Sequence, residues 1–173
     1  MQVAIIIPPK DFKDETLAEL KLMLDKWHIQ AVISSYTSEE CVGYHGAIYK
    51  PEVNAAKLEE RKFDAVVFID GPGVDSYKLY DFRPLLDTLR NFYASGMLIG
   101  AVGNAIKIVA RANIISGVRI AVPNDAETRR LVQLYKGVLS ERAVEIDRNI
   151  ISARGYESIT EFSNAILDKF GVR

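Results

Sequence analysis

The chain has 173 residues, of which 49% are hydrophobic and 26% are charged, with 22 Lys and Arg against 23 Asp and Glu. This balance is typical of a globular chain with a sizeable core and excludes intrinsic disorder. A formal net charge of -1 and the absence of a basic run argue against nucleic acid as a partner. The single cysteine, Cys41, excludes an internal disulfide.

The sequence also predicts the cellular compartment of the protein and the number of its domains. No apolar run is long enough to span a membrane, and residues 1–8 lack the cationic start and cleavage site of a secretory signal. We therefore expect a cytoplasmic protein without a membrane partner. Because there is no linker rich in Pro, Gly or Ser and no internal repeat, residues 1–173 are predicted to form one domain.

Five short segments are continuously apolar or β-branched, which is typical of buried parallel strands. They are residues 3–7, 31–36, 65–69, 97–102 and 149–153. Amphipathic helices are predicted after the first strand with Asp14 as the cap, between the third and fourth strands, and after the fifth, where Gly171 ends the helix. This alternation predicts an α/β fold with a doubly wound, flavodoxin-like parallel sheet sandwiched by helices.

Two segments interrupt the alternation. In residues 41–51, Gly43 and Gly46 flank a turn between alternating residues, which predicts a small inserted hairpin. In residues 118–146, a helix over 125–135 precedes a segment, 138–146, with the alternation of an edge strand. We expect both segments to pack outside the main sheet.

The loops after the strands are where a site is expected, because open parallel sheets bind ligands beyond the carboxyl ends of their strands. These loops are residues 8–15 after the first strand, 70–73 after the third and 103–105 after the fourth. A strand order of 2-1-3-4-5 makes the three loops converge. Glu15, Asp70 and Asn104 are then predicted to be neighbours.

Several motifs occur in a characteristic order along the chain. They are Glu15-Thr16-Leu17, Gly43-Tyr44-His45-Gly46, residues 63–68 before Gly71-Pro72-Gly73, Ile99-Gly100-Ala101-Val102 before a helix, and residues 149–155 before the last helix. In this order and spacing the sequence resembles the ThiJ/PfpI family, within the class I glutamine amidotransferase-like superfamily. The similarity runs nearly end to end.

The resemblance implies a cysteine nucleophile at a sharp strand-to-helix turn, often followed by histidine, with a glutamate from the first loop beside the thiol. In this chain the nucleophile position is Gly103 and the next residue is Asn104, whereas Glu15 matches the glutamate. Asp70 stands where the family commonly has glycine. The resemblance therefore implies a member without the nucleophilic cysteine, which argues against protease, amidase, glyoxalase and deglycase activity.

Three hypotheses for function remain open. The first is a non-catalytic, oligomeric pseudoenzyme whose vestigial active-site pocket binds a small ligand or none. The second is a hydrolase or lyase that uses Glu15 and Asp70 in acid–base or metal-assisted chemistry. The third is a scaffold or regulatory protein that acts through a tyrosine-rich interface. We predict no cofactor.

The candidate catalytic residues are Glu15 and Asp70, and the candidate ligand-binding residues are Gly71, Gly73, Gly103, Asn104 and Arg154. Backbone amides of the glycines and of the 103–104 turn would cradle an anion at a helix start, and Arg154 would hold an anion or pair with an acid. Structural alternatives exist for each acid and amide. Glu15 would stabilise a helix start, Asp70 would form an Asx turn, and Asn104 would cap the following helix.

Two further groups of residues are candidates, the pair Cys41 and His45 as metal ligands and a set of tyrosines as an interface. Glu39 and Glu40 should raise the pKa of the Cys41 thiol, so Cys41 is not expected to be a relocated nucleophile. Cys41 and His45 are too few ligands for a metal site, and none is predicted. The family resemblance implies dimers or larger rings, and the expected interface is rich in tyrosine. The tyrosines concerned are Tyr36, Tyr44, Tyr49, Tyr77 and Tyr80.

Overall fold

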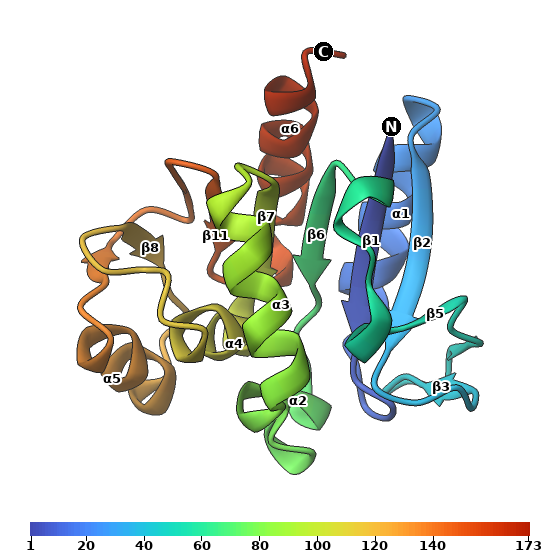
Figure 1. The fold of residues 1–173 in the computed structure, drawn as a ribbon, viewed down its shortest axis with the longest axis horizontal. Helices are drawn as coiled ribbons and strands as arrows, with labels where there is room; N and C mark the ends of the chain where they lie inside the picture. Colours follow the sequence, from blue (N-terminus) through green and yellow to red (C-terminus); the bar gives the residue numbers. More distant parts are fainter.

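The computed structural model describes residues 1–173. Its centre is a seven-stranded sheet in the order β10-β11-β7-β6-β1-β2-β5 (Figure 1). The strands are β1 (Gln2–Ile7), β2 (Gln30–Ser35), β5 (Val53–Asn54), β6 (Ala65–Phe68), β7 (Leu98–Val102), β10 (Val144–Asp147) and β11 (Ile150–Ala153). Only β10 runs antiparallel to its neighbour. The five predicted strands and their order are confirmed.

Helices cover both faces of the sheet, as predicted. α1 (Asp14–Lys26) and α6 (Ile159–Phe170) pack side by side on one face, and α3 (Arg83–Ala94) and α4 (Ile106–Arg111) cover the other (Figure 1). The short α2 (Pro72–Ser76) follows β6, and α5 (Ala126–Leu134) packs outside α4. The strands of the sheet therefore lie in the middle layer of three.

Successive residues of each strand point to opposite faces of the sheet. In β1, Ile5 packs in the core beside α1 and α6, whereas Ile6 packs in the core beside α3 and α4. Because both faces are covered, both residues are buried. This double burial is why the strands are continuous apolar runs in the sequence.

The inserted hairpin is confirmed as β3 (Cys41–Val42) and β4 (Ile48–Tyr49), a separate antiparallel pair. Its turn is held by α1, because the Asp14 carboxylate accepts hydrogen bonds from the backbone N–H groups of His45 and Ala47, each at 2.8 Å. The prediction that Asp14 caps α1 is therefore wrong. Asp14 is the first helical residue, and its side chain binds the hairpin instead.

Residues 118–146 differ from the prediction. β8 (Arg119–Ala121) and β9 (Val138–Ser140) form a small parallel sheet outside the main one, but β10 joins the edge of the main sheet. The chain bends after β9 because the Ser140 hydroxyl donates to Glu145 at 2.6 Å and accepts from the N–H of Arg142 at 3.1 Å. The single predicted strand 138–146 is thus two strands in two sheets.

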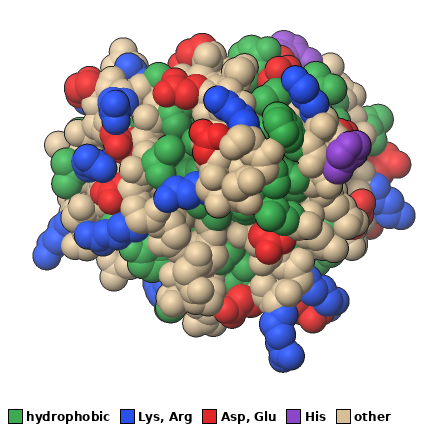
Figure 2. Space-filling view, turned by 90° about the horizontal axis from the view of Figure 1, so that it is seen from above, with side chains coloured by type: hydrophobic (Ala, Val, Ile, Leu, Met, Phe, Trp, Pro, Cys, Tyr) green, Lys and Arg blue, Asp and Glu red, His purple; other side chains and the backbone are tan.

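The surface carries charges of both signs. On the face shown in Figure 2, Lys and Arg side chains lie among Asp and Glu side chains, with hydrophobic side chains between them. Neither sign dominates this face, in keeping with the net charge of -1. No helix in the protein combines the length and the apolar character needed to cross a bilayer.

Candidate functional site

Three loops meet at the carboxyl ends of β1, β6 and β7, at the lower end of the sheet in Figure 1. The first loop leads to Glu15 in the first turn of α1, the second contains Asp70, and the third begins at Gly103. The N–H of Lys13 donates to the carbonyl of Asp70 at 2.8 Å, which ties the first loop to the second. The loops thus converge as the strand order requires.

Gly103 forms the sharp turn between β7 and the following helical segment. Its φ is +57°, in the left-handed region that favours glycine. A Cβ at this position would lie 2.8 Å from Oδ2 and 3.0 Å from Cβ of Asp70. The Asp70 side chain therefore occupies the space that a side chain at position 103 would need.

Asp70 is a buried acid, with 7% of its surface exposed. Burial raises the pKa of its carboxyl group from 3.8 to about 6, and the negative charge of Glu15 acts in the same direction. A hydrogen bond with the side chain of Thr16 and the positive charge of Lys13 oppose this increase. Asp70 therefore exchanges its proton closer to neutral pH than an exposed aspartate does.

Three oxygen atoms in this region are buried and make no well-aligned hydrogen bond within the protein, although the side chain of Thr16 lies close enough to Asp70 to lower its pKa. They are Oε1 of Glu15, Oγ1 of Thr16 and Oδ1 of Asp70. Nε2 of His45 lies 3.7 Å from Oε1 of Glu15. Chemically, this arrangement can hold a proton or bind a small hydrogen-bond donor.

Asn104 has a structural partner on each side of its amide. Its Oδ1 accepts from the N–H of Gly71 at 3.1 Å, and its Nδ2 donates to the carbonyl of Gly71 at 2.8 Å and to Asp75 at 3.2 Å. Asn104 therefore clamps the loop after β6 and makes no helix cap. The N–H of Gly73 donates to Asp11 at 3.1 Å. The N–H groups of Gly71 and Gly73 are thus already engaged within the protein and are not available to an anion.

Lys107 extends this clamp, and sequence reasoning missed it. Its side chain is 1% exposed, and Nζ lies 2.7 Å from Oδ1 of Asp75 and 3.4 Å from Oε1 of Glu127. Burial alone would lower the pKa of Lys107, but its hydrogen bond to Asp75 and the neighbouring acids raise it. The available signal was a lysine inside the apolar run Ile106–Val109, where an unpaired charge would be unstable.

Arg154 and Cys41 lie outside this cluster. Arg154 lines a separate pocket of about 260 Å³ with Asn124 and Glu157, and it forms no ion pair within 4 Å. The expected pairing of Arg154 with an acid is therefore wrong. Cys41 is fully buried, and burial raises the pKa of its thiol. The expected direction is thus reproduced, but burial rather than the neighbouring acids causes it.

The tyrosines that were expected to form an interface divide into two groups. Tyr44 is 62% exposed on the hairpin turn and Tyr77 is 48% exposed after α2. Tyr36 packs against Phe82, whereas Tyr49 packs against Phe12. Only part of the tyrosine set therefore faces solvent.

The sheet order and the glycine turn after β7 define an α/β protein of flavodoxin-like architecture with Glu15 and Asp70 at the strand ends. The model of the DJ-1/PfpI family matches residues 1–169, and the chain belongs to this family. A relative is an uncharacterized protein of Methanocaldococcus jannaschii, 26% identical over 166 residues, which are 96% of this chain and 80% of the relative.

Solved structures share the fold at lower sequence identity. A ThiJ/PfpI domain protein from Brachyspira murdochii is 20% identical with a TM-score of 0.92, over 99% of this chain and 97% of that one. DJ-1beta from Drosophila melanogaster is 20% identical with a TM-score of 0.83, over 99% of this chain and 91% of that one. These likenesses bear on the fold alone.

Proposed function

We propose that this protein is a DJ-1/PfpI family member that performs no thiol chemistry and acts as a non-catalytic, self-associating protein. The observation that carries this proposal is the position of the Asp70 side chain, which fills the space beside Gly103. The Cβ atom of a cysteine at this turn would lie 2.8 Å from Oδ2 and 3.0 Å from Cβ of Asp70, so Asp70 would have to move to admit it. The surface of the protein has two pockets of about 750 and 700 Å³. Neither is lined by Glu15, Asp70 or Gly103, so these residues do not face either pocket.

The remaining thiol does not replace a nucleophile. The thiolate is the reactive form of cysteine, and it forms readily only where the pKa is lowered. Burial instead raises the pKa of Cys41, and its Sγ donates to the carbonyl of Glu39 at 3.8 Å. Both features favour an unreactive, protonated thiol.

A test compares thiol reactivity in the native protein. Iodoacetamide should leave the native wild-type chain unmodified by mass spectrometry. In the background Cys41→Ser, the double substitution Asp70→Gly/Gly103→Cys should create a thiol that reacts within the assay, because removal of the carboxylate opens the turn. Fast alkylation of Cys41 in the wild type, reduced by Glu15→Gln, would contradict the proposal.

A second candidate function is acid–base catalysis by Glu15 and Asp70. It is supported by the pKa of Asp70 of about 6 and by a buried oxygen atom in each carboxyl group that makes no well-aligned hydrogen bond. A general base works best with a pKa near the operating pH. Hydrolysis of p-nitrophenyl acetate by the wild type, lost in both Asp70→Asn and Glu15→Gln but kept in Asp87→Asn, would establish this function in place of the first.

A further inference from the structure

A pocket of about 750 Å³ lies beside the candidate site but is separate from it. Its walls come from the loop after β1, the loop after β2 and the segment after α2. The connection from β1 and the connection from β6 leave on opposite faces of the sheet, so these strands mark its switch point. Ligands of α/β sheets bind at this place, and the volume is in the range of small-molecule sites.

One wall of this pocket is aromatic. The rings of Tyr36 and Phe82 form an edge-to-face pair with centroids 4.9 Å apart, and Leu79 packs beside them. Such a wall favours a planar ring, because aromatic pairs gain energy beyond the burial of their area. The hydroxyl oxygen of Tyr36 is also buried without a hydrogen-bond partner in the protein.

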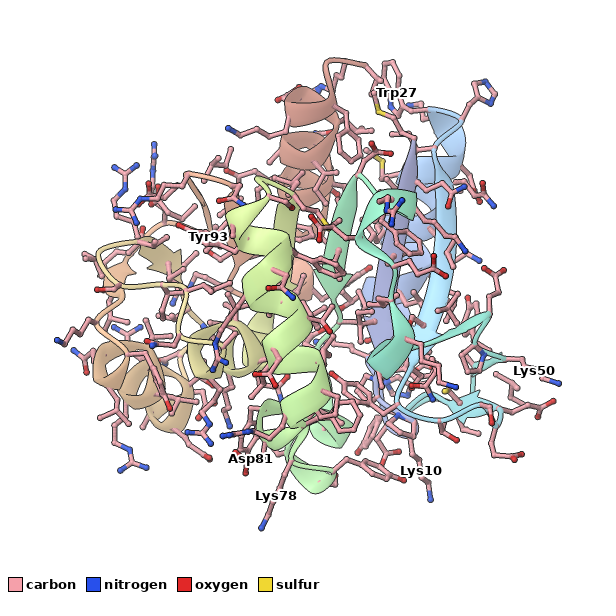
Figure 3. All side chains as sticks on the ribbon, viewed as in Figure 1. Lys10, Trp27, Lys50, Lys78, Asp81 and Tyr93 are labelled. Atoms are coloured by element: carbon pink, nitrogen blue, oxygen red, sulfur yellow. The ribbon has the colours of Figure 1, made fainter.

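The rim of the pocket carries two positive and two negative side chains, all without partners. Lys10 and Lys78 project from the same end of the molecule in Figure 3. Glu39 and Glu40 belong to the loop after β2. None of the four lies within 4 Å of an opposite charge. The fifth charged residue, Asp81, is already paired with Arg111 at 2.8 Å.

We propose that this pocket binds a zwitterionic aromatic molecule of the α-amino-acid class. The ring would pack on the wall of Tyr36 and Phe82, the carboxylate would face the lysines, and the ammonium group would face the glutamates. A purely anionic ligand would leave the glutamates unpaired, and a purely cationic ligand would leave the lysines unpaired. A zwitterion matches both sets of charges at once.

Calorimetric titration with three indole probes tests this charge pattern. L-tryptophan carries both charges, indole-3-propionate lacks the ammonium group, and tryptamine lacks the carboxylate. We expect L-tryptophan to bind tightest, with each of the other two weaker by a factor of about two to five, the size of a solvent-exposed ion pair. Equal binding of all three probes, or no heat from any of them at millimolar concentration, would overturn the proposal.

Variants then assign each charge to its side of the pocket. Lys10→Gln/Lys78→Gln should remove the preference for L-tryptophan over tryptamine and keep its preference over indole-3-propionate. Glu39→Gln/Glu40→Gln should have the opposite effect. The control Lys26→Gln, at the far end of α1, should leave both preferences unchanged.

A change in the aromatic wall provides a further check. Phe82→Leu keeps an apolar side chain and removes the ring, so it should weaken all three probes by a similar factor. If Phe82→Leu leaves binding unchanged while the protein stays folded, the ligand does not occupy this pocket. The test is independent of the thiol assay, because the pocket shares no residue with Glu15, Asp70 or Gly103.

Discussion

Gly103 combines two constraints on its side chain, a positive φ and contact with Asp70. We predict that Gly103→Ala lowers the free energy of unfolding by about 1–3 kcal/mol, because a non-glycine residue is strained in this conformation. In an Asp70→Gly background the same substitution should cost less, because the contact is gone. Urea denaturation measures the loss of unfolding free energy on Gly103→Ala in the wild-type background and in the Asp70→Gly background, and the two losses are compared.

Gly46 supplies the matched control for this prediction. It also has a positive φ, +93°, but a Cβ there would meet no atom within 4 Å. Gly46→Ala therefore reports the backbone cost alone and should be unaffected by Asp70→Gly. An equal cost of Gly103→Ala in both backgrounds would show that Asp70 does not restrict the turn.

The raised pKa of Asp70 predicts a pH-dependent contribution to stability. Its carboxyl group titrates at about 6 in the fold against 3.8 ordinarily, so the folded state binds this proton more tightly. The stabilisation by the proton is fully present below about pH 4 and is lost as pH rises through about 6. Asp70→Asn should therefore be more stable than the wild type at pH 7, by up to about 3 kcal/mol.

The difference between wild type and Asp70→Asn isolates this residue from the other carboxylates. It should shrink as pH falls from 7 to 4, as followed by urea denaturation at each pH. Asp87→Asn, an exposed acid paired with Arg90, is the control and should show no such trend. A difference that stays constant from pH 4 to 7 would place the pKa of Asp70 outside this window.

At the residue scale, topology was predictable and hydrogen bonding was not. The strand order placed Glu15, Asp70 and Asn104 on converging loops because parallel strands end at one edge. The hydrogen-bond partners of Asn104 and Asp14 depend on which backbone N–H and C=O groups in the folded loops have no other hydrogen bond. Local capping rules therefore assigned both residues to helix starts, whereas one clamps Gly71 and the other holds the hairpin.

At the scale of elements, α1 and the β3–β4 hairpin are joined through one carboxylate. We predict that Asp14→Ala destabilises the protein by about 1–3 kcal/mol, because the exposed N–H of His45 and the half-buried N–H of Ala47 both lose a charged acceptor. Hydrogen exchange at the amides of His45 and Ala47 should accelerate more than in the sheet. The control Asp25→Ala, on the exposed side of α1, should leave this exchange unchanged.

The elements that were predicted correctly are those with a strong apolar pattern. β1, β7 and β11 are buried on both faces and are therefore visible as continuous apolar runs. β5 has two half-buried residues, which leaves no periodicity in the sequence to detect. The break between β9 and β10 comes from one serine side chain, a contact that periodicity does not represent.

For the whole molecule, the hairpin is the surface that we expect to mediate self-association. Val42, Tyr44 and Ile48 are 37%, 62% and 60% exposed. We predict that the wild type sediments as an oligomer and that Tyr44→Glu/Ile48→Glu lowers its mass, because charges would be buried at the contact. Leu134→Glu, on exposed α5, is the control. A monomeric wild type in analytical ultracentrifugation would refute this expectation.

The two rims of the central sheet limit how copies of the chain can join. One rim is β5, with two residues, and the other is β10, with four residues and β8 beside it. Neither offers a long row of free backbone donors and acceptors on which a foreign strand can template. Growth of the sheet from molecule to molecule is therefore disfavoured at both sides. Side-chain contacts, which can close on themselves, are the favoured way to assemble this protein, and a continuous ladder of the amyloid kind is disfavoured.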